Sequence, residues 1–424
     1  MSTGGSEKRS YLLSFLDQAA SAASNAFIVL AVTRWQGLER AGEFAVAYSF
    51  FLLALGLCRA YYGEAALQAS QDHALAAARS VRHTAQALAT FVLVGVLLFA
   101  VSLAFDEDIS DYLVTFAFGA PLLLLQDYQR YLLFRFRRYG WAVASDTLWF
   151  GVSAAAYLVA PDLPENLAQV WVFGGCVSLL LTSVGIARIV SESPHAAGDR
   201  GGAVESTHPP GAWRRALFGN FLITQGSTQA VTLITAAVAG ATAVGALRTV
   251  ATPYGLLFVL YVGTGVAVLT SPTAPSFRRM LAIFLGAAAV MALAIELAPT
   301  RLGETLVGVG GWQSVQELNL PIAASLVGQG WVYAAALLWR RRGHIAHFVR
   351  LRLFASLAPL AGAYVGATRD GAYGAAVGLA AAHLIAGGVS LGLSIRWLAR
   401  QETADIGPTD RSSAPRDVDD QDAQ

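Results

Sequence analysis

The sequence contains little charge, little cysteine and almost no lysine. Of its 424 residues 13% are charged, and a single lysine, Lys8, accompanies 28 arginines. Its two cysteines, Cys58 and Cys176, both fall inside long apolar runs. Two such cysteines form neither a disulfide framework nor a metal site, so we expect them to be small buried residues.

Motifs that carry chemistry are also missing. The phosphate-binding pattern G-x-x-x-x-G-K-[ST] does not occur, and no polar segment is long enough to hold an ATPase domain. A His-Glu-x-x-His motif is absent, and His195 and His208 lie in a polar segment without partners at metal-ligand spacing. The sequence therefore predicts neither an enzyme nor an ATP-driven pump, with no catalytic residue and no metal site. A channel is not favoured either, because no filter segment or ring of charges is visible.

Long apolar runs are what the sequence does contain. It is 55% hydrophobic, with a mean hydropathy of +0.52. Runs of about 20 apolar residues match the thickness of a bilayer, where the backbone must satisfy its hydrogen bonds internally as helix. We expect an all-α polytopic membrane protein with about twelve transmembrane helices. The predicted spans are 11–33, 42–64, 84–105, 111–133, 141–160, 167–190, 214–239, 247–271, 279–300, 320–339, 350–367 and 371–398.

The arginines predict the orientation of these spans. Basic residues gather before the first span and then in every second connection, whereas the other connections carry acidic groups such as Asp106, Glu107 and Asp108. Because basic loops stay on the cytoplasmic side, both termini are predicted to be cytoplasmic. The basic residues that set this pattern are Lys8, Arg9, Arg79, Arg82, Arg135, Arg137, Arg138, Arg200, Arg214, Arg215, Arg278, Arg279, Arg340, Arg341, Arg342, Arg350 and Arg400.

Two polar segments divide the chain. Residues 191–212 are rich in Gly, Pro and Ser and are predicted to be a cytoplasmic linker. Residues 399–424 are polar and acidic, and we expect a disordered cytoplasmic tail. The remaining segments, 1–190 and 213–398, would then be two lobes of six helices each.

The two lobes resemble one another when one is shifted by 203 residues. Gly37 and Gly42 then align with Gly240 and Gly245. Polar residues of the first and seventh spans align as well, at offsets of four, seven and eight residues that place them on one helical face. These aligned residues are Asp17, Ser21, Ser24 and Asn25 in the first lobe and Asn220, Thr224, Ser227 and Thr228 in the second. Six spans per lobe make this a parallel repeat, with a pseudo-two-fold axis along the membrane normal.

A repeat of this kind predicts a central cavity between two lobes that rock by alternating access. The eight aligned polar residues are candidates to line it, although hydroxyl groups can equally hold helices together. Asp17 is a candidate ion-coupling residue, because a carboxylate inside the membrane is costly unless it faces water or a partner.

Other charges near the spans have two interpretations. Glu64, Asp127, Arg130 and Asp146 lie toward the inner ends of their helices and are candidates for an inner gate or for structural ion pairs. Arg248 and Arg34 stand near the outer ends of their spans, where a guanidinium could hold a phosphate or anchor a helix at the interface. Arg59 ends the second span five residues before Glu64, with which it could form a loose ion pair. Glu296 is interpreted as interfacial and His383 as a packed, hydrogen-bonded helix residue.

The chain resembles Wzx-type polysaccharide flippases of the multidrug/oligosaccharidyl-lipid/polysaccharide (MOP) exporter superfamily. The resemblance is carried by the first two spans, LDQAASAASNAFIVLAVTRWQGLERAGEFAVAYSFFLLALGL, by QDYQRYLLFRFRR and by ALRTVATPYGLLFVLYVG, and the six-plus-six layout extends it over about residues 1–398. Unlike a strongly cationic member, the chain has no lysine within its spans. Peptidoglycan-precursor flippases usually have fourteen spans and resemble it less.

This resemblance implies a secondary transporter that moves polyprenyl-pyrophosphate-linked oligosaccharide from the inner to the outer leaflet of a bacterial cytoplasmic membrane. Arg248 and Arg59 would then contact the head group, with Asp17 coupled to H⁺ or Na⁺ and no other cofactor. Glycosyltransferases or a polymerase of a polysaccharide pathway would be its partners, and nucleic acid would not. A cation-coupled multidrug exporter of the same superfamily and a non-transporting scaffold for glycan assembly are the alternatives.

Overall fold

The computed structural model describes residues 3–68, 81–159, 166–192, 218–219, 221–270, 276–342 and 345–405. These residues form helices joined by short turns, as expected for apolar segments that must satisfy their own backbone hydrogen bonds. The helices are α1 (Thr3–Cys58), α2 (Glu64–Gln68), α4 (Val81–Ser102), α5 (Glu107–Arg135), α6 (Tyr139–Val159), α7 (Leu167–Glu192), α9 (Ser227–Thr270), α10 (Phe277–Glu296), α11 (Thr300–Arg341) and α12 (Ile345–Asp405), with short π-helices η1 (Arg59–Gly63) and η3 (Leu222–Gly226).

Three of the long helices fold back on themselves. α1 reverses at Gly37 and α9 at Gly240, each with a positive φ, of 86° and 83°, that favours glycine. α12 reverses at Asp370 and Gly371. Eight helical segments of the described chain are long and apolar enough to cross a membrane. Counting these reversals and α6, the described residues contain twelve segments of membrane-crossing length.

The predicted boundaries were wrong in three places. α5 starts at Glu107 rather than Asp111, because Glu107 and Asp108 sit in its first turn, where the helix dipole favours acidic side chains. Residues 301–319 were left outside the predicted spans, yet they are helical, with a kink at Gly308. Residues 399–405 extend α12 instead of beginning a tail. Residues 406–424, and 193–212 of the predicted linker 191–212, lie outside the described residues.

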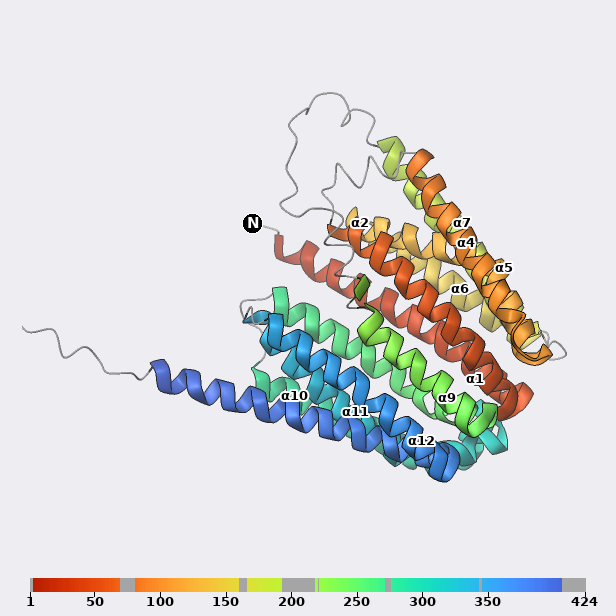
Figure 1. Cartoon of the computed structure of the whole chain (residues 1–424). Helices are drawn as coiled ribbons and strands as arrows, with labels where there is room; N and C mark the ends of the chain where they lie inside the picture. Colours follow the sequence, from red (N-terminus) through yellow and green to blue (C-terminus); the bar gives the residue numbers. More distant parts are fainter. Residues whose placement is uncertain are drawn as a thin grey trace, which may run out of the picture.

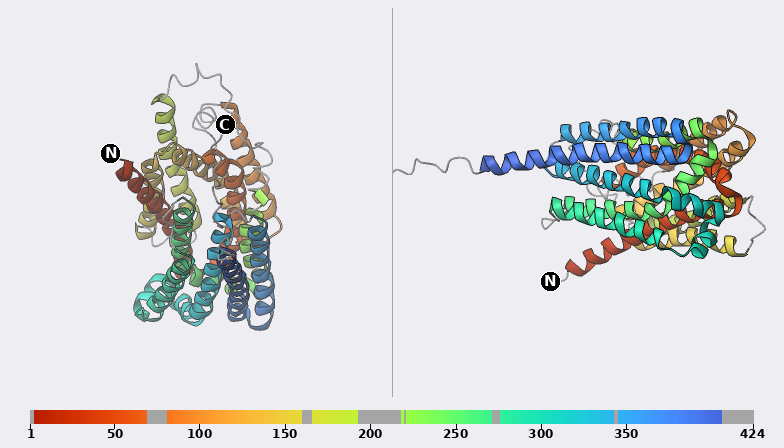
Figure 2. Two further views of the ribbon diagram at one scale, coloured as in Figure 1. Left: turned by 90° about the vertical axis from the view of Figure 1, so that its left-hand side faces the viewer. Right: turned by 90° about the horizontal axis from the view of Figure 1, so that it is seen from below.

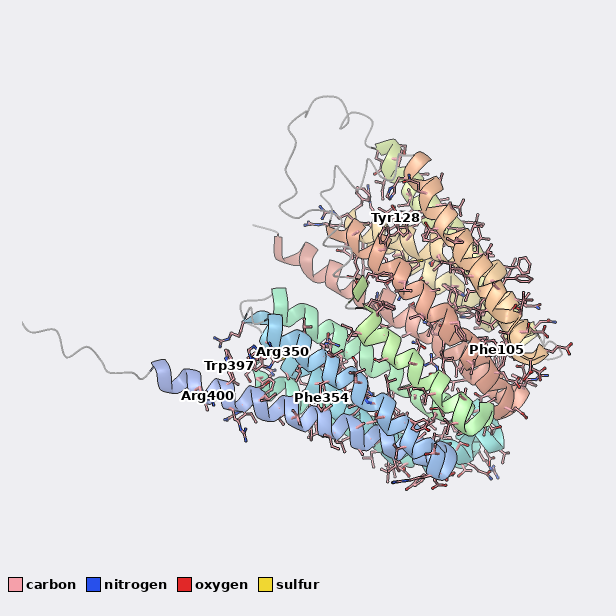
Figure 3. The ribbon with its side chains drawn as sticks, in the orientation of Figure 1. Phe105, Tyr128, Arg350, Phe354, Trp397 and Arg400 are labelled. Atoms are coloured by element: carbon pink, nitrogen blue, oxygen red, sulfur yellow. The ribbon has the colours of Figure 1, made fainter. Side chains whose placement is uncertain are left out.

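The helices form two lobes (Figure 1). α1 and α2 pack with α4, α5, α6 and α7 in the first lobe, and α9 packs with α10, α11 and α12 in the second. The lobes meet along α1 and α9, and the start of α1 lies at the same end as the end of α12 (Figures 1 and 2). Arg350, Trp397 and Arg400 lie at that end and Phe105, beside the acidic turn, at the other (Figure 3). Following the predicted sidedness, we refer to the end with Arg350 and Arg400 as the inner end and to the end with Phe105 as the outer end.

At the outer end the lobes touch through small residues. A Cβ on Gly42 would lie 1.8 Å from the carbonyl oxygen of Ala241, and one on Gly245 would lie 1.8 Å from that of Leu38. The 203-residue shift converts Leu38 into Ala241 and Gly42 into Gly245, so the two contacts are equivalent. The backbones of α1 and α9 therefore cross at the pseudo-two-fold axis. The hydroxyls of Thr33 and Thr249 are hydrogen-bonded across the same contact at 2.8 Å. The lobes are therefore closed together at their outer end.

Candidate functional site

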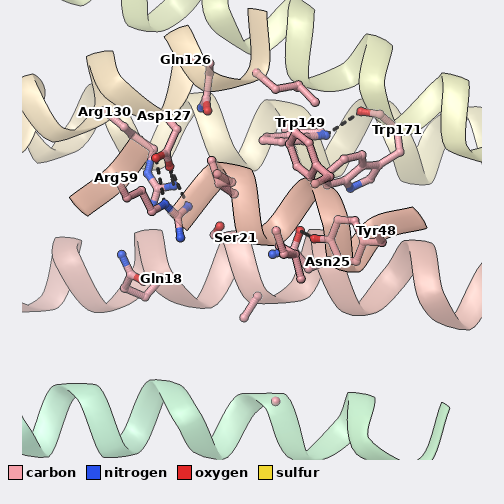
Figure 4. Close-up of a pocket in the computed structure, with 16 residues that line it drawn as sticks. Gln18, Ser21, Asn25, Tyr48, Arg59, Gln126, Asp127, Arg130, Trp149 and Trp171 are labelled. Atoms are coloured by element: carbon pink, nitrogen blue, oxygen red, sulfur yellow. Dashed lines mark hydrogen bonds and ion pairs between the residues drawn. The ribbon is translucent and has the colours of Figure 1, made fainter. Parts of the chain in front are cut away.

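A cavity of about 220 Å³ opens within the first lobe and faces the second (Figure 4). One side carries charged and amide groups, and the other carries aromatic rings. Its lining residues are Gln18, Ser21, Ala22, Asn25, Tyr48, Phe51, Leu52, Leu55, Arg59, Leu123, Gln126, Asp127, Arg130, Trp149, Trp171 and, across from them on α9, Gly255.

The aromatic side is held rigid by hydrogen bonds. The indole N–H of Trp149 donates to the carbonyl oxygen of Trp171 at 2.7 Å, and the Tyr48 hydroxyl donates to Oδ1 of Asn25 at 2.9 Å (Figure 4). Trp171 in turn donates to the Ser24 hydroxyl at 3.2 Å. Ser24 is buried behind this wall and does not line the cavity, whereas Ser21 and Asn25 do, as predicted.

The charged side centres on Arg130, which is almost completely buried. Its guanidinium contacts carboxylates from three helices: Asp17 of α1 at 2.7 Å, Asp127 of α5 at 3.4 Å and Asp146 of α6 at 3.5 Å. Asp127 is one helical turn before Arg130, the predicted i,i+3 pair. The pairs with Asp17 and Asp146 join helices of the first lobe, so Arg130 binds the inner halves of α1, α5 and α6 together.

Asp127 has a second and stronger partner in Arg59. The Nε and Nη2 groups of Arg59 donate to the two oxygens of Asp127 at 2.8 and 2.7 Å, a bidentate pair (Figure 4). The Arg59 side chain keeps 36% of its surface exposed, on the cavity side. Glu64, which the sequence placed near Arg59, does not line the cavity.

Neutral groups complete the surroundings of Asp146. The amide of Gln126 donates to the Ser145 hydroxyl at 3.1 Å and to Oδ1 of Asp146 at 3.3 Å. Ser145 donates onward to the carbonyl oxygen of Ser178 on α7. These bonds fix Asp146 between α5 and α7, where it is 1% exposed.

Three carboxylates face two guanidinium groups in this charge cluster, which consists of Asp17, Arg59, Asp127, Arg130 and Asp146. With all five groups ionised its formal charge is negative by one. Two oxygens, Oδ1 of Asp17 and Oδ2 of Asp146, are buried without a hydrogen bond. A buried cluster of charges is tolerated only when its members satisfy one another, so the uncompensated charge makes this a place where a proton or cation would bind.

Arg248 and Arg34, two further predicted head-group candidates, occupy different positions. Arg248 of α9 is half-buried, with its guanidinium 5.8 Å from the centre of the Tyr48 ring, and it has no ion pair among the described residues. Arg34 instead donates to the backbone carbonyls of Glu304, at 3.0 Å, and Thr305 at the outer end. Arg248 therefore stays beside the cavity, whereas the Arg34 side chain is used to join the lobes.

Three residues of the polar face predicted on the seventh span, Thr224, Ser227 and Thr228, are not among the residues that line this cavity. Ser227 and Thr228 donate to the carbonyl oxygen of Thr224, and Thr224 donates to that of Phe221. Short hydroxyl side chains in a helix commonly bond back to the preceding turn in this way, and they then hold the helix rather than a ligand. Asn220, the fourth residue of that face, lies outside the described residues.

The sequence analysis missed the aromatic wall and Gln126. Gln126 directly precedes Asp127, and a polar residue beside a carboxylate in a transmembrane helix was an available signal. The sequence carried no such signal for Tyr48, Trp149 and Trp171, because aromatic residues are equally common where they only pack. Glu296, interpreted from the sequence as interfacial, accepts a hydrogen bond from the Asn319 amide at 2.7 Å. His383, interpreted as a hydrogen-bonded helix residue, is hydrogen-bonded to Ser325 at 2.8 Å. Within the described residues no group of His, Cys, Asp and Glu has the geometry of a metal site.

Comparison with known proteins gives the fold. No family model matches the sequence, and no curated protein matches it. Among solved structures, the chain is similar to a multidrug resistance MATE family transporter of the MOP superfamily in its inward-facing conformation, with a TM-score of 0.64 and 13% identity over 90% of this chain and 96% of that one. An outward-facing structure of such a transporter gives 0.63 and 14%, over 94% and 96%.

A third structure with this fold is a MOP superfamily transporter from Pyrococcus furiosus, described as having a binding pocket of reversed polarity that suggests a different function. Its TM-score is 0.58 at 14% identity, covering 95% of this chain and 97% of that one. At these identities the similarity concerns the backbone. The chain is therefore an all-α, multi-pass membrane protein with the two-lobe, twelve-helix fold of MOP superfamily transporters.

Proposed function

We propose that the chain is a secondary transporter that moves a polyprenyl-diphosphate-linked oligosaccharide from the inner to the outer leaflet by alternating access. The fold supports transport, because solved structures with this fold face inward in one case and outward in another. The closed outer contact at Gly42 and Gly245 involves small groups and few hydrogen bonds, as an interface that opens during each cycle requires.

The observation that carries the choice of substrate is Arg248. A guanidinium without a carboxylate partner is costly inside a membrane protein, unless an anion arrives to pair with it. Arg59 presents a guanidinium to the cavity, and Arg248 lies beside it, 5.8 Å from the ring of Tyr48, which is one of the lining residues. A guanidinium in the cavity wall and a second one next to it suit a diphosphate, since each oxygen of a phosphate accepts charge-assisted hydrogen bonds.

Ion coupling is assigned to the charge cluster, with Asp17 as the first candidate. Its position against Arg130, with one oxygen unpaired, supports this role. Replacement of Asp17 by Asn should impair transport while leaving the protein folded, whereas normal transport by this variant would contradict the role. An inner-gate role of Glu64, Asp127, Arg130 and Asp146 stays a second proposal. Among the last three, the Asp127–Arg130 pair lies within α5, and the Arg130–Asp146 pair joins α5 to α6 in the same lobe.

A cation-coupled multidrug exporter is the alternative that one specific observation favours. The charge cluster has more carboxylates than arginines, and that excess would attract a cationic drug. The Pyrococcus furiosus transporter, described as having a pocket of reversed polarity, supports the possibility that pockets of opposite charge are built on this fold. A scaffold for glycan assembly has no such support, because it would not need an unpaired Arg248 beside a cavity.

The experiment that tests the proposal is the leaflet distribution of lipid-linked glycans in a bacterial host that carries a deletion of the gene. Accumulation on the cytoplasmic leaflet with loss of a surface polysaccharide, both restored by complementation, is the expected result. Unchanged glycans together with altered sensitivity to cationic drugs would select the multidrug exporter instead.

A further inference from the structure

One carboxylate, Asp127, lies between two arginines. It makes a bidentate pair with Arg59, at 2.7 and 2.8 Å, and a looser contact of 3.4 Å with Arg130. Arg130 is drawn the other way by Asp17 at 2.7 Å and Asp146 at 3.5 Å. Asp127 and Arg130 are on the same face of α5, so a small rotation of side chains would convert their loose contact into a full ion pair.

The charge of the cluster decides which arrangement is stable. With three ionised carboxylates, Asp17 and Asp146 together hold Arg130, and Asp127 is left to Arg59. If one proton neutralises Asp146 or Asp17, Arg130 loses one of its anchors and turns toward Asp127. The five groups together are then neutral, and the four groups other than Arg59 carry one negative charge instead of two, so the cluster holds Arg59 less strongly.

Two buried oxygens without a hydrogen bond show where that proton can bind. They are Oδ1 of Asp17 and Oδ2 of Asp146, whose side chains are 0% and 1% exposed. Oδ1 of Asp17 accepts a proton without breaking a hydrogen bond, and Oδ2 of Asp146 gives up only its 3.5 Å contact with Arg130. The cluster therefore has an empty position for one positive charge at the end opposite to Arg59.

We propose that Asp127 is a switch shared by two arginines: uptake of one proton by Asp17 or Asp146 transfers Asp127 to Arg130 and releases Arg59 to bind a phosphate group in the cavity. The proton comes from water through the cavity and returns there, with no other group transferred. Arg130 acts as a positioning residue, since it does not itself touch the substrate. The inference rests on the proposed function, because it requires an anionic substrate.

The switch fixes the sign of the coupling between proton and substrate. Proton uptake and phosphate binding strengthen one another by the same factor, because binding linkage is reciprocal. A cationic substrate would behave in the opposite way, since it would compete with the proton for the excess negative charge. The direction of this pH effect therefore separates the two candidate functions at the level of binding.

The other ionisable groups around Asp127 and Asp146 do not change this sign. Cys58 lies before Arg59 and Tyr131 follows Arg130, and both side chains act electrostatically on the cluster. Thiol and phenol groups of this kind are neutral near pH 7. Glu64 of α2 acts on Tyr131. The groups that α7 presents to Ser145 and Gln129 are the neutral carbonyl of Ser178 and the neutral hydroxyls of Thr182 and Ser183.

The test measures binding of farnesyl diphosphate to the purified full-length protein in detergent. Asp146→Asn and Asp17→Asn imitate the protonated carboxyl without a change of shape, and each should lower the Kd at about pH 8 by about tenfold. Asp127→Asn should lower it similarly, because Arg59 is then released permanently. Asp108→Asn, which removes an equal charge at the outer surface, is the matched control and should leave the Kd unchanged.

A pH series then tests the proton itself. The titration of the ligand affects all proteins equally, so it cancels in the ratio of Kd values between wild type and Asp146→Asn. That ratio should fall toward one between about pH 8 and about pH 6, and Arg59→Gln combined with Asp146→Asn should abolish the gain in affinity. The ratio of Kd values could instead stay constant with pH and fall when sodium is added at constant pH and ionic strength. In that case the cluster binds a sodium ion, and the proposal that it takes up a proton is wrong. A thermal unfolding measurement on each variant identifies loss of fold.

Two results would overturn the switch. If farnesyl diphosphate binds but Asp146→Asn and Asp17→Asn leave its Kd unchanged or raise it, the switch is wrong while the anionic substrate stands. If neither wild type nor Asp127→Asn binds it, and a cationic dye such as ethidium binds and is displaced at low pH, both the switch and the proposed function are wrong.

Discussion

The interiors of the two lobes use polar groups in opposite ways. In the first lobe five charged side chains from α1, η1, α5 and α6 form one buried cluster beside a cavity. In the second lobe the buried polar groups are mostly neutral: Asn319 accepts from Tyr254 and donates to the carbonyl oxygen of Ala292, and Ser325 bonds to His383. One lobe of a repeat thus carries the ionic chemistry while the other supplies a neutral partner surface and Arg248.

This difference shows that the two lobes of the repeat share their backbone conformation more closely than their charged side chains. Gly37 and Gly240 adopt nearly the same conformation, with ψ of 177° and 173°. Asp17, at the same spacing as Asn220, anchors an ion-pair cluster that depends on Asp127, Arg130 and Asp146. Close backbone packing requires matching residues in both lobes, whereas a charge cluster needs its full set of partners in only one.

The largest effect should come from removing the centre of the charge cluster. Arg130→Met leaves Asp17 and Asp146 buried without a cation, and we expect the free energy of unfolding to fall by about 3–5 kcal/mol. Unfolding of the purified protein in detergent, followed by denaturant titration, measures the loss. In the second lobe, Asn319→Leu should cost less, about 1–3 kcal/mol, because hydrogen bonds are lost, one of them to the Glu296 carboxylate, but no ion pair is broken. Equal losses would show that the two interiors do not differ as described.

Substrate binding should depend on the charge and on the shape of Arg248. Arg248→Ala should raise the Kd for farnesyl diphosphate by about 10- to 100-fold, the range expected from about 1.5–3 kcal/mol for a hydrogen bond to a charged group. Arg248→Lys keeps the charge but not the planar pair of donors and should raise it less. Equal effects of the two substitutions would indicate that Arg248 serves packing or anchoring.

The outer contact between the lobes should respond symmetrically to small substitutions. Gly42→Ala and Gly245→Ala each place a Cβ 1.8 Å from a carbonyl oxygen of the opposite lobe, which should destabilise the closed arrangement by about 1–3 kcal/mol. The population of the closed arrangement can be measured by introducing Thr33→Cys and Thr249→Cys into a protein without the native cysteines and joining the two thiols with a short cross-linker. Gly151→Ala, where a Cβ meets nothing within 4 Å, should leave cross-linking unchanged. If only one of the two glycines responds, the contact is not symmetric.

The smallest effect should be that of the Thr33–Thr249 hydrogen bond. Thr33→Val removes one neutral hydrogen bond at the outer contact, which contributes about 1 kcal/mol. The cross-linking of a second cysteine pair, at Leu38 and Ala241, should fall by about fivefold. A change as large as that of Gly42→Ala would show that the hydroxyl pair, rather than the backbone approach, holds the lobes closed.

The sequence by itself determined the class of fold and the layout of its helices. Apolar runs of bilayer length can only be helices, and the arginines in alternate connections limit how those helices can be arranged. The glycines at 37, 42, 240 and 245 predicted the repeat, because tight turns and close backbones require the same residue wherever they occur. The solved structures with this fold agree with the two-lobe arrangement.

The tertiary structure alone decided which charges meet. The sequence placed Asp127 and Arg130 together because a helix brings residues three apart onto one face, but it could not place Asp17 and Asp146 beside them, since those contacts join different helices. Nor could it tell that Arg59 pairs with Asp127, that Arg34 joins the lobes, or that Thr224, Ser227 and Thr228 face their own helix. A helical period gives the direction of a side chain around its own axis, and only the packing of several helices decides what it faces.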